Sequence, residues 1–370
     1  MSQSRHLHIA VSGHGFGHAA QLSPIVTALR DAVPGLRTSL AGALPPAAAL
    51  EFFGPLETHD DPPLDVGMVM AGPMRVLAEE SLRAYLAFHE NWETKVVAEA
   101  ARLVALAPDL VLADVPYLPL AGAAQAGIPA VALSSLNWAE IFAHYCGTDT
   151  HAMAITNTIR DAYNSAHAFL QVSPTMAMPG LGNLQTLGPV ARIGQDRKAA
   201  ILEQAGHPST TRLALCSLGG IKTGAPDISL PVIENLAWIA GTGGGDPTRP
   251  DVLDQHKLAM PFIDQLASAD LVITKPGYGT FTEAACNGTR VLYASRGDWP
   301  EEAALGAWLH EVGCACEIPA EVLANGNFGD AIADILSRPC PAPVSPSGIK
   351  QATDLLKTLI GEPSTPAPDG

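Results

Sequence analysis

The sequence predicts an α/β protein in which two doubly wound parallel sheets follow one another along the chain. Short apolar segments alternate with helical patterns through almost all of the 370 residues, as in consecutive βαβ units. Several of these segments are continuous apolar runs, which is typical of parallel strands that helices cover on both faces. The alternation restarts near residue 210, so we expect two tandem Rossmann-like domains with a cleft between them.

Each expected strand is a short apolar segment bounded by polar or turn-forming residues. In the first domain these segments span residues 6–12, 37–42, 109–114, 130–135 and 168–173. In the second domain they span residues 212–219, 236–241, 257–260, 270–274 and 290–295. Helical patterns lie between the strands, among them 23–32, one long stretch over 81–106, and 279–288.

The segment 186–206 separates the two series, because Gly, Pro and a charged cluster replace any strand pattern there. We interpret it as the connection between an N-terminal domain of residues 1–190 and a C-terminal domain of residues 207–345. The prolines near residue 340 exclude regular structure. The amphipathic pattern that follows, at 349–360, predicts a last helix that crosses back onto the first domain.

We expect a first strand rather than a signal peptide at the N-terminus, because it lacks a basic segment followed by a long apolar stretch. Residues 361–370 are expected to form a flexible tail. No run approaches the roughly 18–20 apolar residues of a transmembrane segment. Six cysteines in a chain of this length do not suggest a disulfide scaffold, so we expect a cytoplasmic protein.

The charge balance argues against several kinds of partner. The chain has 21 basic and 37 acidic residues, a net charge of −16, and no basic block. Nucleic acid and anionic membranes attract clustered Lys and Arg, so we expect no nucleic-acid partner. We also expect no metal site, because Cys314 and Cys316 have no second Cys/His pair at zinc-ligand spacing and no D-x-D motif occurs.

The stretch SGHGFGHA follows the first strand, and a turn by itself requires neither of its histidines. Its glycines permit positive φ and let the backbone approach a ligand; they are Gly13, Gly15 and Gly17. Neutral imidazole can take a proton near pH 7, so His18, and after it His14, are candidate catalytic residues. A helix that begins around Ala19 would direct its N-terminal amides to the same place. The alternative is a tight turn whose histidines face solvent and have no role.

The stretch ITKPGYGTFTEAACNG, residues 273–288, has the pattern strand, turn, helix. We expect the helix to start near Thr280, where a phosphate would be stabilised by free N–H groups and the helix dipole. Glu283, on the first helical turn, would then reach the hydroxyls of a ribose. The alternative is a capping box, because Thr280 and Glu283 are three residues apart.

Two more strand ends of the second domain carry candidate ligand-binding residues. The sequence SLGG ends the first strand there, and its glycines could cradle a diphosphate, although no G-K-[ST] is present. After the strand at 290–295, a loop carries carboxylates that could accept hydrogen bonds from sugar hydroxyls, namely Asp298, Glu301 and Glu302. The alternative for this cluster is a helix N-cap with Pro300 in the first turn.

Polar residues also follow strands of the first domain. Asp114 ends one strand and is a partner for His18, or its competitor as the base; the segment 134–138 follows another strand and could face the cleft. The apolar stretch 66–74 could touch a lipid-like acceptor in a peripheral membrane contact, with packing under the neighbouring helix as the favoured alternative. We interpret residues 60–63 as a turn.

Together these motifs resemble the GT-B nucleotide-sugar glycosyltransferases, in particular the branch of the peptidoglycan lipid II-forming N-acetylglucosaminyltransferase. GFGH resembles the Gly-Gly-His that ends the first glycine-rich turn of that family, and KPGYGTFTEA resembles its donor-site pattern. The resemblance implies a nucleobase contact from Phe262 and Ile263, a phosphate contact from Thr280, and a ribose ligand in Glu283. It adds a set of donor-binding candidates: Gly15, Gly17, Ser217, Gly219, Gly220, Lys275, Gly277, Gly279, Asp298, Glu301 and Glu302.

The motif GHGFGHA also resembles a motif in the glycosyltransferase-like half of plant arabinose kinases. The resemblances imply transfer of a sugar from a nucleotide-diphosphate sugar to the hydroxyl of a small-molecule or glycoconjugate acceptor. A UDP-sugar is the first candidate for the donor. No further cofactor and no metal would be required. Three alternatives stay open: a nucleotide-sugar epimerase of the same fold, a non-catalytic nucleotide-sugar binding protein, and a dinucleotide oxidoreductase. The last is disfavoured because no acidic residue ends the second strand.

Overall fold

The computed structural model describes residues 4–14, 16–72, 75–218, 228–241, 249–295 and 297–361. These residues divide into two compact units. Unit 1 takes the described residues of Met1–Ala71, Val76–Val190 and Ser347–Gly370, and unit 2 takes those of Gly72–Arg75 and Ala191–Pro346. The last helix of the chain therefore belongs to the same unit as the first strand.

The described part of unit 1 forms a seven-stranded sheet in the order β3-β2-β1-β4-β5-β6-β7, with every pair parallel. The strands are β1 (His6–Val11), β2 (Arg37–Ala41), β3 (His59–Asp60), β4 (Leu110–Asp114), β5 (Ala130–Ser134), β6 (Ala168–Val172) and β7 (Leu184–Leu187). All six residues of β1 are buried, His6 and His8 included, as expected for a strand between two helical layers. The strand order reverses between β1 and β4, which is the topological switch point of such a sheet.

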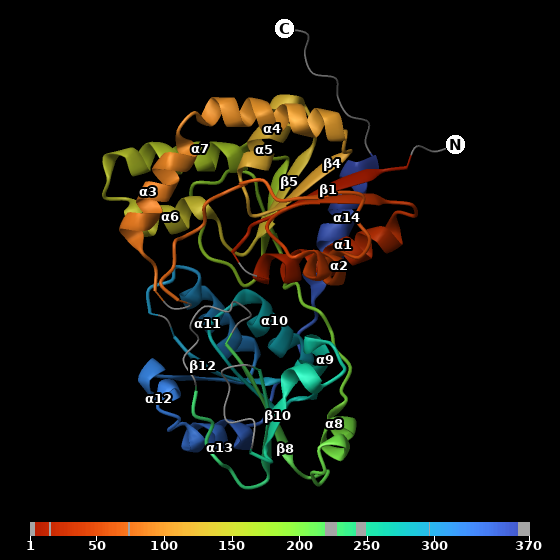
Figure 1. Ribbon diagram of the computed structural model, residues 1–370, viewed down its shortest axis with the longest axis vertical. Helices are drawn as coiled ribbons and strands as arrows, with labels where there is room; N and C mark the ends of the chain where they lie inside the picture. The colour runs from red at the N-terminus through yellow and green to blue at the C-terminus, as the bar shows by residue number, and fades with distance from the viewer. Residues whose placement is uncertain are drawn as a thin grey trace. The chain divides into compact units, whose positions relative to one another are not determined.

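Helices cover this sheet and include the end of the chain. They are α1 (Gly17–Ala32), α2 (Pro46–Phe53), α3 (Ala78–His89), α4 (Trp92–Leu106), α5 (Leu118–Ala126), α6 (Trp138–Cys146), α7 (Thr150–Asn164) and α14 (Ser347–Gly361). In Figure 1 the blue α14 lies beside the red α1, and the two helices pack together. Helix α6 begins after Asn137, whose side chain accepts a hydrogen bond from the N–H of Glu140 at 2.8 Å.

The described part of unit 2 forms a six-stranded parallel sheet in the order β10-β9-β8-β11-β12-β13. The strands are β8 (Arg212–Ser217), β9 (Leu236–Ala240), β10 (Val252–Asp254), β11 (Leu271–Thr274), β12 (Arg290–Ala294) and β13 (Ala315–Ile318). Its helices are α8 (Lys198–Gln204), η1 (Gln255–Lys257), α9 (Phe262–Ser268), α10 (Tyr278–Asn287), α11 (Glu302–Val312), α12 (Ala320–Ala324) and α13 (Gly329–Ser337). A core around Trp238, Phe328 and Ile332 packs between this sheet and its helices. The strand order again reverses, here between β8 and β11.

The two doubly wound sheets confirm the predicted fold class. The strand predicted at 257–260 is wrong: the edge strand is β10, and η1 begins directly after it. The segment 186–206 was expected to lack strands, but it shares β7 with the preceding residues and contains α8. The long helix predicted over 81–106 is two helices, because Asn91 adopts a left-handed conformation between α3 and α4 (φ 58°).

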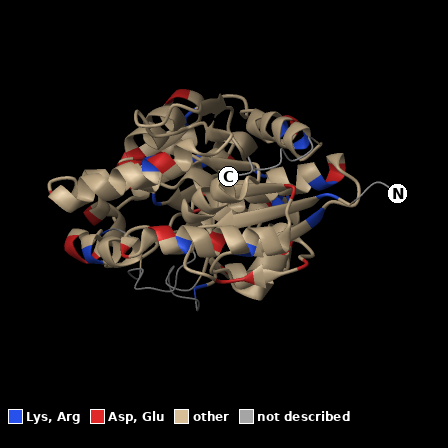
Figure 2. Cartoon of the chain, turned by 90° about the horizontal axis from the view of Figure 1, so that it is seen from above, with Lys and Arg blue, Asp and Glu red and all other residues tan. Residues whose placement is uncertain are grey.

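Charged residues are distributed along the helices rather than gathered at one end of the chain. Figure 2 shows acidic and basic positions interspersed on the helices that face the viewer. Several are paired one helical turn apart, as Arg83 and Glu80 are on α3. No helix among the described residues combines the length and apolar character that a membrane crossing requires.

Candidate functional site

His18 and Asp114 form a hydrogen-bonded pair at the switch point of unit 1. Nδ1 of His18, on the first turn of α1, lies 2.8 Å from Oδ1 of Asp114, the last residue of β4. The parallel register sets Val11 of β1 opposite Asp114, which places the loop after β1 beside the end of β4. Asp114 is fully buried and the His18 side chain is 12% exposed. Of the two roles predicted for Asp114, its position corresponds to that of the partner.

This pairing selects the tautomer of the His18 imidazole. A carboxylate only accepts hydrogen bonds, so the proton of a neutral imidazole lies on Nδ1 and the lone pair on Nε2. The structure therefore gives His18 the arrangement of a general base, with an orienting carboxylate behind it.

Trp138 fixes the position of both histidines from the first turn of α6. Its indole contacts the His14 ring at a centroid distance of 5.1 Å and the His18 ring at 6.0 Å, both edge-on. The indole N–H donates to Oδ2 of Asp65 at 2.8 Å. The backbone N–H of Trp138 donates to the hydroxyl of Tyr163, which in turn donates to the carbonyl of Val115, the residue after Asp114. The start of α6 and the end of β4 are thus tied together.

His14 lies in a tighter environment than His18. Its Nδ1 is 3.0 Å from the hydroxyl of Ser12, and its ring packs against the backbone of Gly67. Gly67 has a φ of 61°, and a Cβ there would lie 2.0 Å from the imidazole, so no other residue fits. Burial lowers the pKa of His14 below its usual 6.5, even though the carboxylate of Asp65 acts in the opposite direction. His14 is therefore neutral at pH 7.

A hollow of about 310 Å³ opens beside His14, at the carboxyl ends of β1, β2 and β3. We call it the β1–β3 hollow, and its wall consists of Val11, Gly13, His14, Gly42, Ala43, Asp61, Pro62, Pro63, Leu64 and Asp65. The segment interpreted as a mere turn thus contributes part of this wall. Gly42 allows β1 and β2 to approach each other here, since a Cβ at this residue would lie 2.5 Å from the carbonyl oxygen of Val11.

In unit 2 the predicted donor-binding residues gather where three neighbouring strands end. Ser217 of β8 is in register with Thr274 of β11, which is in register with Tyr293 of β12. Lys275 and Gly277 follow β11, and the acidic loop follows β12. The carboxyl edge of this sheet, at its own switch point, therefore brings together the residues predicted from three separate motifs.

Helix α10 starts earlier than predicted, which changes the position of Thr280 within it. Its N-cap is Gly277 and its first residue is Tyr278, so Thr280 lies inside the first turn. The capping-box alternative is therefore wrong. Thr280 is half-buried, and a Cβ at Gly279 would meet no described atom within 4 Å, so this turn is open on one side. Its amides point toward the end of β11, an arrangement suited to an anion.

The carboxylate of Glu283 is engaged by a basic residue from the connection. Oε1 of Glu283 lies 2.6 Å from Nε of Arg192, and the Glu283 side chain is 5% exposed. Burial raises the pKa of Glu283 above its usual 4.5, although Arg192 acts against this shift. A ribose contact by Glu283 would have to share the carboxylate with Arg192, and this role stays a prediction.

Residues 192–195 of the connection are hydrogen-bonded to side chains of α9 and α10. Asn287 donates to the carbonyl of Arg192 at 3.0 Å and accepts from the N–H of Gly194 at 2.9 Å. Asp264 accepts from the N–H of Gln195 at 3.0 Å. A Cβ at Gly194 would lie 2.3 Å from the carbonyl oxygen of Ile263, one of the two predicted nucleobase contacts. Ile263 is buried and Phe262 half-buried at the start of α9; their contact with a base stays a prediction.

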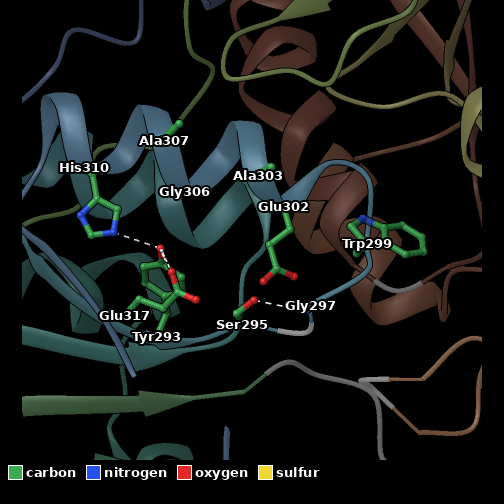
Figure 3. Close-up of a pocket in the computed structure, with 10 residues that line it drawn as sticks. All are labelled: Tyr293, Ser295, Gly297, Trp299, Glu302, Ala303, Gly306, Ala307, His310 and Glu317. Atoms are coloured by element: carbon green, nitrogen blue, oxygen red, sulfur yellow. Dashed lines mark hydrogen bonds between the residues drawn. The ribbon is translucent and has the colours of Figure 1, made fainter. Parts of the chain in front are cut away.

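The acidic loop leads into a second hollow, of about 250 Å³, between α11 and the strands β12 and β13 (Figure 3). Glu302 lines it beside Ser295 and Gly297, while Glu301 is buried and Asp298 is exposed. At its other end the Tyr293 hydroxyl lies 3.1 Å from Nε2 of His310 and donates to Glu317 at 3.2 Å. Helix α11 begins at Glu302 with Glu301 as its N-cap, so Pro300 precedes the first turn.

Three predicted site residues, Gly15, Gly219 and Gly220, lie outside the described residues. Among the residues that the structure describes, no three His, Cys, Asp or Glu side chains gather in a way that could hold a metal ion. Sequence reasoning missed Asp65 and gave Trp138 only as part of a segment that might face the cleft. Their hydrogen bond joins positions 73 residues apart, so no local pattern marks it.

Comparison with known proteins bears on the fold of the chain. No family model matches the chain. The chain is 26% identical over 375 residues to L-arabinokinase of Arabidopsis thaliana, an alignment that covers 97% of this chain and 35% of that protein. The chain thus spans about a third of the length of this curated relative, and the predicted likeness to plant arabinose kinases is confirmed.

Solved structures share the architecture over nearly the whole chain. One is a UDP-glucosyltransferase from Polygonum tinctorium capable of glucosylating indoxyl, with a TM-score of 0.60, 12% identity, and coverage of 98% of this chain and 100% of that one. Another is CalG4, the calicheamicin glycosyltransferase, with a TM-score of 0.58, 17% identity, and coverage of 97% and 94%. Which branch the chain belongs to stays a prediction. The chain has the GT-B fold, the two-domain fold of these glycosyltransferases.

Proposed function

We propose that the chain is a glycosyltransferase that moves a sugar from a nucleotide-diphosphate sugar, with UDP as the first candidate nucleotide, to an acceptor hydroxyl. The observation that carries this proposal is the His18–Asp114 pair at the switch point of unit 1. The likeness in fold to glycosyltransferases, one of them a UDP-glucosyltransferase, supports it. The reaction would need no cofactor besides its two substrates, the nucleotide sugar and the acceptor.

In the proposed reaction, Nε2 of His18 takes the proton of the acceptor hydroxyl as the oxygen attacks the anomeric carbon of the donor sugar. Asp114 stabilises the imidazolium that forms, because its buried carboxylate accepts the Nδ1 proton throughout. The bond between the anomeric carbon and the diphosphate oxygen breaks, and the nucleoside diphosphate leaves with the electron pair.

The donor would bind to unit 2, at the carboxyl ends of β8, β11 and β12. Negative charge that builds on the leaving diphosphate would be stabilised by the amides of the first turn of α10, with Lys275 and Thr280 beside them. We propose that these dipoles replace a divalent metal in this role. The carboxylates of the loop before α11 would accept hydrogen bonds from the donor sugar.

The proposal is tested by turnover with a panel of UDP-, GDP- and dTDP-sugars, first alone and then with pools of hydroxylated acceptors. We expect acceptor-dependent release of a nucleoside diphosphate, lost in His18→Gln. If the protein were a non-catalytic sensor, it would bind the nucleotide sugar and show no turnover with any acceptor pool. An epimerised donor in the absence of acceptor would favour the rival enzyme of the same fold. Either of these results contradicts the proposal.

A further inference from the structure

The β1–β3 hollow lies within unit 1, and it connects to the proposed base His18 through residues that contact both. His14 forms part of its wall, and the indole of Trp138 contacts both His14 and His18. Gly13, also in the wall, follows Ser12, whose N–H donates to the carbonyl of Asp114 at 2.9 Å. A molecule held in this hollow would therefore contact His14, which the indole of Trp138 joins to His18.

The charged side chains in the wall of the hollow are all acidic. Its titratable groups are the carboxylates of Asp61 and Asp65 and the imidazole of His14, and Lys and Arg do not occur among its described lining residues. His14 is half-buried, and desolvation lowers its pKa, so it adds little positive charge at pH 7. The wall thus presents up to two negative charges to whatever enters it.

The two carboxylates differ in how firmly they are held. Asp65 is half-buried and its Oδ2 accepts the indole N–H of Trp138 at 2.8 Å, which fixes its orientation. Asp61 is exposed and lies at the rim. Each carboxylate can accept more than one hydrogen bond, and such groups hold vicinal hydroxyls well. They repel phosphate and carboxylate groups at close range, and the low dielectric of a partly buried wall strengthens that repulsion.

We propose that the β1–β3 hollow binds an acceptor that is rich in hydroxyl groups and carries no negative charge, with Asp65 and Asp61 as the residues that determine this specificity. The inference rests on the proposed function, because it makes the hollow the acceptor site of that reaction. It excludes sugar phosphates, uronic acids and diphosphate-linked lipids as acceptors. Asp65 accepts hydrogen bonds from the acceptor inside the hollow, and Asp61 adds its charge at the rim.

The test uses four probes with one carbon skeleton and different charge: D-glucose, D-glucosamine, D-glucuronate and D-glucose 6-phosphate. Binding to the full chain is measured without any donor, by saturation-transfer NMR with competition. We expect glucose and glucosamine to bind about tenfold or more tightly than the two anions, a difference of about 1.4 kcal/mol. In Asp65→Asn and Asp61→Asn the anions gain relative to glucose. The amide oxygen that Asp65→Asn introduces can still accept the indole N–H, and Asp61 is exposed, so both variants are expected to fold.

Asp161→Asn is the matched control, because Asp161 is an exposed carboxylate on α7 of the same unit and does not line the hollow. It should leave the order of the four probes unchanged. Tighter binding of either anion, an order that Asp65→Asn and Asp61→Asn do not change, or no binding of any probe at millimolar concentration would each overturn the inference. The assay contains no donor, so the charge order can hold while sugar transfer is absent, and transfer can be found while the charge order fails.

Discussion

The proposed reactivity of His18 depends on the group behind it rather than on the ring alone. His18 and His151 both lie near a carboxylate, but the Asp114 side chain is fully buried, whereas Asp149 and His151 are 38% and 76% exposed. A buried carboxylate holds one tautomer and one ring orientation, and an exposed pair does neither reliably. The sequence showed both residue types and offered Asp114 as a partner for His18. The burial that distinguishes this pair from the exposed one depends on the fold.

Replacing His18 by Gln should lower kcat by about 10²–10⁴-fold, the range that a positioned general base contributes. Binding of the nucleotide should persist, because the donor would bind to unit 2. His151→Gln provides the control, since it removes an imidazole from an exposed His–Asp pair on α7. Steady-state kinetics and thermal shift with UDP measure the two properties separately. A His18→Gln enzyme with wild-type kcat would exclude His18 as the base.

Substitution of Arg192 should destabilise unit 2, because the buried carboxylate of Glu283 then loses this ion pair. Glu283 is buried, so Arg192→Met should cost about 3 kcal/mol or more at pH 7. The cost should shrink as the pH falls toward 4.5. A carboxyl with a raised pKa is stabilised in the fold when protonated, and that stability is lost as the pH rises through the folded pKa. Urea unfolding at pH 7 and pH 5 measures both effects.

Arg83→Met is the comparison for this substitution, because the Arg83–Glu80 pair on α3 is exposed at 67% and 45%. It should change the free energy of unfolding by less than about 0.5 kcal/mol. Equal costs for the two substitutions would show that burial of Glu283 does not determine the effect.

At the scale of the elements, the central strands were predictable and the edges were not. The strands β4, β5 and β11 are apolar up to their last residue, and β1 is mostly apolar, so sequence alone locates them. The edge strand β7 carries exposed Gln185 and Thr186, and its pattern is lost in a polar segment. The break between α3 and α4 is hidden, because the apolar periodicity continues across Asn91 while its left-handed backbone ends the helix.

The first strand of unit 1 contains a buried, hydrogen-bonded histidine, His8, that should make the free energy of unfolding depend on pH. Arg102 donates to Nε2 of His8 at 3.0 Å, and Nδ1 of His8 lies 2.9 Å from the Ser39 hydroxyl. Burial, followed by the charge of Arg102, lowers the pKa of His8 from 6.5 to about 3. His8 in the unfolded chain therefore binds a proton below pH 6.5. In the folded chain it stays neutral until the pH falls to about 3.

The free energy of unfolding should accordingly fall as the pH decreases from 6.5, with His8 contributing a slope of up to about 1.4 kcal/mol per pH unit. In His8→Leu this contribution disappears, although the variant is less stable at pH 7 because Arg102 and Ser39 lose a partner. His151→Gln, at an exposed position, should keep the wild-type slope. Equal slopes between pH 6 and pH 5 in wild type and His8→Leu would contradict this assignment.

Two glycines at strand or helix ends should respond to alanine in opposite ways. Gly42→Ala places a Cβ 2.5 Å from the Val11 carbonyl oxygen at a φ of 151°, so it should lower stability by about 1–3 kcal/mol. Gly279→Ala adds a Cβ in open space on the first turn of α10, so stability should not fall. If the diphosphate binds there, Gly279→Ala should weaken UDP binding several-fold. Thermal unfolding with and without UDP distinguishes the two effects.

At the scale of the whole molecule, the sequence predicted two doubly wound sheets and the return of the last helix to the first unit. Both follow from patterns that repeat over many residues: alternating strands and helices, and a proline-rich segment before an amphipathic one. The site was predictable where a motif follows a strand, as at His18 and Asp114. It was not predictable where residues distant in sequence meet, as at Asp65 and Trp138, because those contacts depend on the complete fold.

The account depends most on a nucleoside diphosphate binding at the first turn of α10. Hydrogen–deuterium exchange of the full chain, with and without UDP, tests this directly, because the amides that hold a diphosphate must exchange more slowly when it is bound. We expect protection over residues 275–281, at the end of β11 and the start of α10. Bound UDP that leaves residues 275–281 unprotected, or protection confined to unit 1, would contradict the account.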